Sequence, residues 1–192
     1  MKIMAVCGSP RKHGNTARLL NEVVAGAKRG GADAEIMYLT DYDIRQCDGC
    51  LVCEGAGCSG TCSIADDMQG QVIPAMLQAD AIVLGTPSYF DLPTGLMKVF
   101  MDRTNMAMTS IAARRLLFAT VIVGQSEPAS LSAVHDALSR YCDILEMRPF
   151  PGNTVQVIAR EPGEVGGQRA ALKAAQALGK SLCSAARTTA TD

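Results

Sequence analysis

Short apolar runs alternate with longer segments of helical spacing along the chain. The short runs predict buried strands over Lys2 to Cys7, Ala34 to Leu39, Ala81 to Gly85, Leu116 to Val123 and Thr154 to Ile158. The longer segments repeat apolar residues along one helix face, over Thr16 to Arg29, Asp66 to Gln78, Leu96 to Arg103, Ser130 to Tyr141 and Gly167 to Ser184. Strands and helices that alternate in this way are typical of βαβ units around a buried parallel sheet. The pattern therefore predicts an α/β fold.

Two stretches interrupt this rhythm. A cysteine-rich insertion runs from Thr40 to Ser63, and a passage rich in Gly and Pro runs from Glu161 to Gly167. An irregular loop longer than about 15 residues inside a compact domain is usually functional. We therefore expect one domain over residues 1–192 in which the cysteine-rich insertion at about 40–63 has a role of its own.

Composition and charge narrow the class of protein. Hydrophobic residues make up 48% of the chain and the formal net charge is −1, so nothing favours nucleic acid or an anionic membrane as a partner. The apolar start is too short for a signal peptide, and no segment approaches the roughly 20 apolar residues that a membrane helix needs. We expect a cytoplasmic protein. Because cytosolic thiols are kept reduced, its eight cysteines favour metal or redox chemistry over disulfides.

The loop between the first strand and the first helix has the composition of a phosphate site. It supplies flexible backbone and polar donors at Gly8, Ser9, Arg11, Gly14, Asn15 and Thr16. Asn15 can cap the helix, whose first-turn amides lie at the positive end of the helix dipole, and Arg11 suits bidentate phosphate contact. The chain lacks the motifs of a triphosphate P-loop and of a dinucleotide fold here. The alternative is an ordinary strand-to-helix turn.

Two further loops are expected at the same edge of the sheet. The third strand leads into Gly85 to Pro93, which includes the adjacent aromatics Tyr89 and Phe90. With the third strand beside the first, as in the strand order 2-1-3-4-5, this loop faces the phosphate loop. Gly124 and Gln125 end the fourth strand and can supply a third loop. The aromatics can instead bury a helix start, and the polar residues after Gly124 can simply end a strand.

Three separated motifs together resemble one family. They are Gly8-Ser9-Pro10-Arg11 with Gly14-Asn15-Thr16, then Asp66-Asp67-Met68, then Thr86-Pro87-Ser88-Tyr89 followed by Lys98 and Asp102-Arg103. This combination, over roughly the first two-thirds of the chain, resembles the flavodoxin-like NAD(P)H-dependent FMN reductases. The cysteine insertion is similar to that of their iron-sulfur flavoprotein branch.

The resemblance implies a fold, a cofactor and its contacts. The fold is a flavodoxin-like three-layer α/β fold, with a five-stranded parallel sheet in the order 2-1-3-4-5 and helices on both faces. The implied FMN contacts are Ser9, Arg11, Asn15, Thr16 and Ala17 at the phosphate, and Thr86, Pro87, Ser88, Tyr89, Phe90, Gly124 and Gln125 toward the ring. Members of the family often have two small residues after the fourth strand, and Gln125 departs from that pattern. The resemblance also implies a homodimer or homotetramer.

The cysteine insertion has the spacing of an iron-sulfur ligand set. Cys47, Cys50 and Cys53 form C-x2-C-x2-C, which can wrap a [4Fe-4S] cluster with Cys58 or Cys62 as the fourth ligand. Structural zinc sites usually separate two such pairs more widely. Without a cluster, the thiols can pack as small apolar groups or form a redox pair. The remaining cysteines, Cys7, Cys142 and Cys183, are expected to be buried. We expect His135 to have a structural role.

Three functional hypotheses follow. The first is an FMN-dependent oxidoreductase that accepts hydride from NAD(P)H and reduces a small-molecule or redox-protein acceptor, with no catalytic side chain required because the flavin carries the chemistry. The second is an iron-sulfur flavoprotein electron carrier with a [4Fe-4S] cluster on the cysteine insertion. The third is a flavin-free metal or thiol sensor on the same fold.

Overall fold

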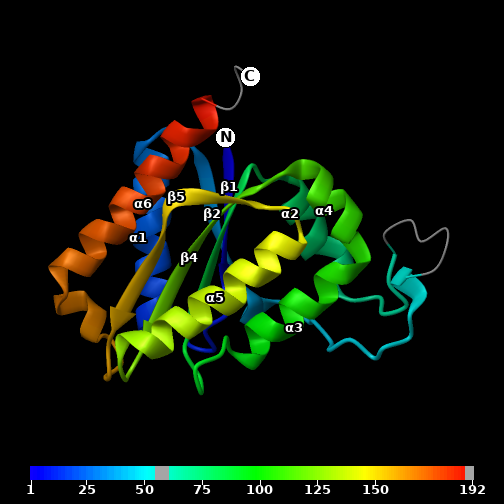
Figure 1. Ribbon diagram of the computed structural model, residues 1–192, viewed down its shortest axis with the longest axis horizontal. Coiled ribbons are helices and arrows are strands. Elements are labelled where there is room, and N and C mark those ends of the chain that lie inside the picture. The colour runs from blue at the N-terminus through cyan, green and yellow to red at the C-terminus, as the bar shows by residue number, and fades with distance from the viewer. Residues whose placement is uncertain (55–60, 189–192) are drawn as a thin grey trace.

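A five-stranded parallel sheet forms the centre of the computed structural model, which describes residues 1–54 and 61–188 (Figure 1). Its strands are β1 (Lys2–Cys7), β2 (Asp33–Tyr38), β3 (Ala81–Pro87), β4 (Leu117–Gly124) and β5 (Arg148–Ile158). They lie in the order β2-β1-β3-β4-β5, and every neighbouring pair is parallel. The predicted strand order is therefore confirmed.

Helices cover both faces of the sheet (Figure 1). One face carries α1 (Asn15–Arg29) and α6 (Arg169–Thr188); the other carries α2 (Ile73–Gln78), α3 (Gly95–Arg103), α4 (Met108–Arg114) and α5 (Pro128–Ile144). Shorter turns complete the chain: η1 (Leu39–Asp41), η2 (Val52–Glu54), η3 (Met68–Val72), η4 (Thr104–Ala107) and η5 (Glu164–Gly167). Because both faces are covered, alternate residues of β1, β3 and β4 enter two separate apolar cores. This arrangement is the expected three-layer fold.

The start of β5 and the short helix α4 differ from the sequence prediction. β5 begins at Arg148, well before the predicted Thr154, and its register against β4 shifts where Phe118 pairs with Pro149 but Thr120 pairs with Thr154. Prolines and a glycine with φ of 69° at Gly152 interrupt the strand pattern there, so the first half of β5 is not recognisable from alternation. The short helix α4 was also not predicted.

Helices α1 and α6 approach each other closely because a glycine of each helix lies against the backbone of the other. A Cβ atom at Gly179 would lie 1.9 Å from the carbonyl oxygen of Val23, and one at Gly26 would lie 2.1 Å from that of Gln176. Real Cβ atoms do not approach an oxygen so closely, so a larger residue at either position forces the helices apart. This packing fixes α1, whose first turn opens toward the candidate site.

We predict that Gly179→Ala lowers the free energy of unfolding by about 2 kcal/mol, because the added methyl group overlaps the backbone of α1. Urea unfolding at equilibrium measures the change. Gly70→Ala is the matched control, since a Cβ atom there meets nothing within 4 Å and alanine favours the helical backbone. Equal stabilities of the Gly179→Ala variant and the wild type would contradict the crossing geometry.

Candidate functional site

A cleft opens at the carboxyl ends of β1, β3, β4 and β5. Its lining residues come from four loops: Ser9, Arg11, Gly14, Asn15 and Thr16; Pro87, Ser88 and Tyr89; Val123, Gly124 and Gln125; and Ala159, Arg160, Glu161 and Pro162. Nine of the sequence-predicted contacts are thus brought together here.

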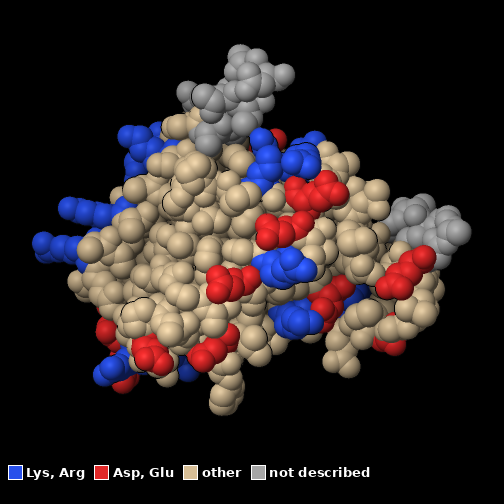
Figure 2. Space-filling model, in the orientation of Figure 1, with Lys and Arg blue, Asp and Glu red and all other residues tan. Residues whose placement is uncertain are grey.

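Acidic and basic side chains are interspersed over the centre of the face shown in Figure 2, in keeping with the net charge of −1.

The phosphate loop turns tightly into α1. Ser9 is buried, and its Oγ accepts a hydrogen bond from the backbone N–H of Arg11 at 3.2 Å. The Gly14 N–H then donates to the Arg11 carbonyl at 3.0 Å, and Gly14 becomes the N-cap of α1 without a side-chain cap. The first-turn N–H groups of a helix have no partner within the helix. Those of α1 begin at the wall of the cleft, where they can meet an anion.

Asn15 does not cap α1, contrary to the sequence-based expectation. Its side-chain amide donates to the Glu161 carbonyl at 2.8 Å and accepts from the Val165 N–H at 3.3 Å. Both polar atoms of the side chain therefore hold the loop after β5 against the start of α1. The residue lines the cleft but uses its side chain to join two of its walls.

Thr94, at the N-terminus of α3, fixes the other side of the phosphate loop. Its buried hydroxyl donates to the Gly8 carbonyl at 2.6 Å and accepts the Met97 N–H at 3.2 Å. The Thr94 N–H in turn donates to Oγ1 of Thr86 at 3.2 Å. Thr86 is fully buried, as is Ala17 in the core, so neither side chain lines the cleft. The side chains of Thr86 and Ala17, both predicted as contacts, therefore pack behind the walls of the cleft.

Phe90 lies outside the cleft. Tyr89 and Leu92 pair through backbone hydrogen bonds of 3.0 and 3.1 Å, which makes the segment between them a two-residue turn. Phe90 and Asp91 have φ values of 53° and 61°, the left-handed conformation that such turns require but that usually selects glycine or asparagine. The Phe90 side chain is 100% exposed at the tip of this hairpin, whereas Tyr89 at its base lines the cleft.

The loop after β5 is the part of the cleft that was not predicted. Gln125 donates to the Arg160 carbonyl at 3.0 Å, and Nε of Arg160 donates to the Gln125 carbonyl at 3.3 Å. The Glu164 carboxylate accepts the N–H groups of Glu161 and Arg160, and these hydrogen bonds hold its pKa below the usual value. The only sequence signal was the Gly and Pro content of residues 161–167. Gly14 and Val123 also line the cleft.

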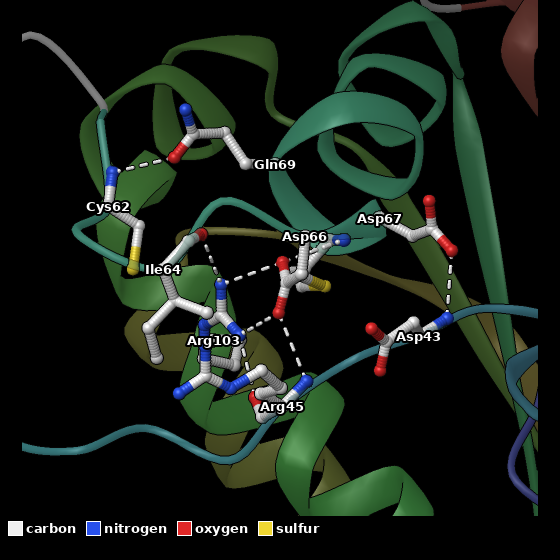
Figure 3. Close-up of polar contacts among 9 residues, drawn as sticks. Asp43, Arg45, Cys62, Ile64, Asp66, Asp67, Gln69 and Arg103 are labelled. Carbon is white, nitrogen blue, oxygen red and sulfur yellow. Dashed lines mark hydrogen bonds and ion pairs between the residues drawn. The ribbon is translucent and has the colours of Figure 1, made fainter.

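The cysteine segment, residues 45–66, is closed at its base by a buried ion pair (Figure 3). Arg103 contacts Asp66 at 2.6 Å, and both side chains are 1% exposed. Burial disfavours both charges, but hydrogen bonds from Arg103 and the Arg45 N–H hold the pKa of Asp66 below its usual value. Arg103 also donates to the carbonyls of Arg45, at one end of the segment, and of Ile64, near the other end.

The described cysteines differ in exposure. Cys47 and Cys50 are exposed, Cys53 and Cys62 are half-buried, and Cys58 lies outside the described residues. Within residues 1–54 and 61–188, no three His, Cys, Asp or Glu side chains are gathered for a metal ion. Four free thiols on one segment nevertheless have the donor chemistry of an iron-sulfur cluster. The predicted cluster ligands therefore stay a prediction.

The other predicted structural residues behave as expected. Cys7, Cys142 and Cys183 are buried, and burial raises the pKa of the Cys7 and Cys142 thiols. His135 bonds Oγ1 of the buried Thr120 at 3.0 Å on the far side of the sheet from α1. Among the described helices, none is both long and apolar enough to cross a membrane.

We predict that Thr94→Val destabilises the protein by about 1–3 kcal/mol, because the Gly8 carbonyl and the Met97 N–H lose their buried partner. Thr94→Ser keeps the hydroxyl and is the control, with a loss of about 1 kcal/mol for the missing methyl group. Urea unfolding of the two variants gives the comparison. A Thr94→Val variant that is no less stable than Thr94→Ser would contradict the contribution of these hydrogen bonds.

We predict that Asp66→Asn costs about 3–5 kcal/mol at pH 7, because Arg103 is left buried and unpaired. The folded state lowers the pKa of Asp66, so the carboxylate contributes fully above its unfolded value of about 3.9 and this contribution disappears as pH falls through the folded pKa. The difference from wild type should therefore shrink below about pH 4.

Urea unfolding at a series of pH values measures this difference. Glu146→Gln is the control, since its ion pair with Arg115 is more than half exposed and contributes less than about 1 kcal/mol. A pH-independent difference for Asp66→Asn would contradict the assignment.

Comparisons with known proteins consistently indicate one family. A model of the NADPH-dependent FMN reductase family matches residues 1–157. An iron-sulfur flavoprotein of Archaeoglobus fulgidus is 40% identical over 146 residues, which cover 73% of this chain and 70% of the relative. Another, from Methanocaldococcus jannaschii, is 28% identical over 188 residues and 95% of both chains.

Solved structures agree on the fold. A WrbA-like flavodoxin from Agrobacterium tumefaciens superposes with a TM-score of 0.68 at 18% identity, over 97% of this chain and 98% of that one. The same family is thus indicated by the motifs at Gly8, Asp66 and Thr86, by the strand order and by the matched relatives. The chain belongs to the NADPH-dependent FMN reductase family and is an FMN-dependent NAD(P)H oxidoreductase.

Proposed function

We propose that the cleft binds FMN with its phosphate at the start of α1, and that hydride from a reduced nicotinamide passes through the flavin to a small-molecule or redox-protein acceptor. The observation that carries this proposal is the meeting of two walls in one cleft: the first turn of α1 and the loop at Pro87 to Tyr89. Ligands of open α/β sheets bind at this edge, where the strand order reverses.

The phosphate end has a free positive charge. Arg11 is exposed, lines the cleft and forms no ion pair with any described residue, whereas neighbouring Lys12 is paired with Asp41. The hydroxyl group of Thr16 and the first-turn N–H groups of α1 add donors beside it. This combination of one guanidinium with several N–H and O–H donors suits a phosphate monoester.

The ring end is narrow and partly apolar. A Cβ atom at Gly124 would lie 2.5 Å from the end of the Leu131 side chain and 3.5 Å from Ser88, so a larger residue here requires Leu131 to move. Tyr89 is half exposed at the base of its hairpin, where it can flank an aromatic ring. Ser88 is held by a bond from its N–H to the Val123 carbonyl at 2.7 Å. When bound, FMN supplies the hydride chemistry, and these residues supply position and shape.

We predict that Arg11→Ala weakens FMN binding by about tenfold to a hundredfold, the loss expected for a charge-assisted hydrogen bond of about 1.5–3 kcal/mol. Titration of the flavin-free protein with FMN, followed by flavin fluorescence, measures the dissociation constant. Lys12→Ala removes an equal charge from the next residue, but one already paired with Asp41, and should change affinity less than threefold. Equal effects of the two variants would refute a specific phosphate contact.

An iron-sulfur electron carrier is the second candidate, favoured by the four described thiols on one segment. Both relatives described above bear the name iron-sulfur flavoprotein. In this proposal, a [4Fe-4S] cluster bound by four of the five cysteines at 47, 50, 53, 58 and 62 exchanges electrons with the flavin.

One measurement separates the candidates: the visible spectrum and iron content of protein purified without oxygen. A flavin band alone supports the reductase, and a flavin band with broad cluster absorption and about four irons supports the electron carrier. A colourless protein that does not take up FMN contradicts both and supports a flavin-free sensor. Light scattering tests the homodimer or homotetramer that the resemblance implies.

A further inference from the structure

The end of α3 and the turn η4 direct N–H groups at the cysteine segment. Asn105, in η4, donates from Nδ2 to the Cys53 sulfur at 3.3 Å. Arg103, the last residue of α3, donates to the carbonyl of Ile64, two residues after Cys62, at 3.4 Å. Figure 3 shows Cys62 and Ile64 on one side of this guanidinium and Asp66 on the other. Donors from one short stretch thus contact one cysteine directly and the backbone close to a second.

Arg103 has one donor that the described residues leave unused. Its Nη1 donates to the Arg45 carbonyl and to Asp66, each at 2.6 Å, and its Nη2 donates to Asp66 at 3.0 Å and to the Ile64 carbonyl at 3.4 Å. These bonds account for four of the five N–H groups of a guanidinium. Nε is buried and has no hydrogen-bond partner among the described residues. A buried donor of this kind needs an acceptor.

Neutral thiols are poor acceptors for such donors. A thiol sulfur accepts hydrogen bonds weakly, whereas a metal-bound sulfur is a thiolate and carries negative charge. N–H groups that point at sulfur therefore gain most when the sulfur is charged. The arrangement at Asn105 and Arg103 suits a charged sulfur centre better than four protonated thiols.

We propose that Arg103 and Asn105 are positioning residues that donate N–H groups to the sulfur atoms of an iron-sulfur centre and raise its reduction potential. This proposal rests on the second candidate function. The centre gains one electron from the reduced flavin and no proton, so its charge becomes more negative by one. Hydrogen bonds to sulfur stabilise that added charge, which favours the reduced form.

The test uses the FMN-loaded, anaerobically purified protein and its Asn105→Ala variant. Redox titration with dithionite, followed by electron paramagnetic resonance of the centre and by flavin absorbance, measures both potentials. We expect about a tenfold lower ratio of reduced to oxidised centre at a fixed ambient potential, equivalent to 59 mV for one electron, with the flavin potential unchanged. Asn105→Asp replaces the donor with a carboxylate and should lower the ratio further.

Asp102→Asn is the matched control. This carboxylate lies on the same turn of α3 but is exposed and paired with Lys98, so the ratio should change less than threefold. Arg103→Lys keeps the buried positive charge beside Asp66 and removes Nε; it should lower the ratio while the iron content stays at the wild-type value. Asn105 is only half-buried, so its variants carry the test if Arg103→Lys does not fold.

The outcomes distinguish this proposal from the one on which it rests. Wild-type protein without iron would refute the electron carrier, and the positioning role with it. A wild-type centre whose potential is the same in Asn105→Ala and Asn105→Asp would overturn the positioning role alone and leave the electron carrier intact. A lower potential in both, with Asp102→Asn unchanged, would establish it.

Discussion

The site depends on the parallel arrangement of β1 beside β3. Because the two strands run in the same direction, their carboxyl ends meet at one edge, and the Gly8 N–H donates directly to the Gly85 carbonyl at 2.8 Å. This approach leaves no room for side chains: a Cβ atom at Gly8 would lie 2.9 Å from Met97, and one at Gly85 would lie 2.5 Å from Leu20. The phosphate loop therefore begins with a backbone contact between the two strand ends.

Polar side chains then join the loops into one cleft. Thr94 binds the phosphate loop to α3, Asn15 binds it to the loop after β5, and Gln125 binds that loop to the end of β4. Each of these bonds links residues distant in sequence. Because side chains make these links, the first-turn N–H groups of α1 are left for an anion. These side-chain hydrogen bonds therefore both shape the cleft and leave its backbone donors unused.

The sequence predicted the parts of this site that are local. The phosphate loop and the segment at Pro87 follow directly from strand ends, and their composition indicates their chemistry. Residues 159–162 carry no comparable signal, since they reach the cleft only through the pairing of β5 with β4. Phe90 was predicted as a contact from its residue type, but the two-residue turn at Tyr89 to Leu92 directs it outward. Turn geometry decided its position.

The base of the cysteine segment is held in place, whereas its exposed cysteines are not held together. Its base is fixed by the buried pair of Arg103 and Asp66, while Cys47 and Cys50 at its exposed part are not gathered with the others. In Figure 1 the segment projects at the right, beyond α3, away from the loops of the cleft. Breaking the base would release both ends of the segment together. If the segment binds the cluster of the second proposed function, the ion pair and the N–H donors beside it are already in place, and Cys47 and Cys50 have to move toward the other cysteines.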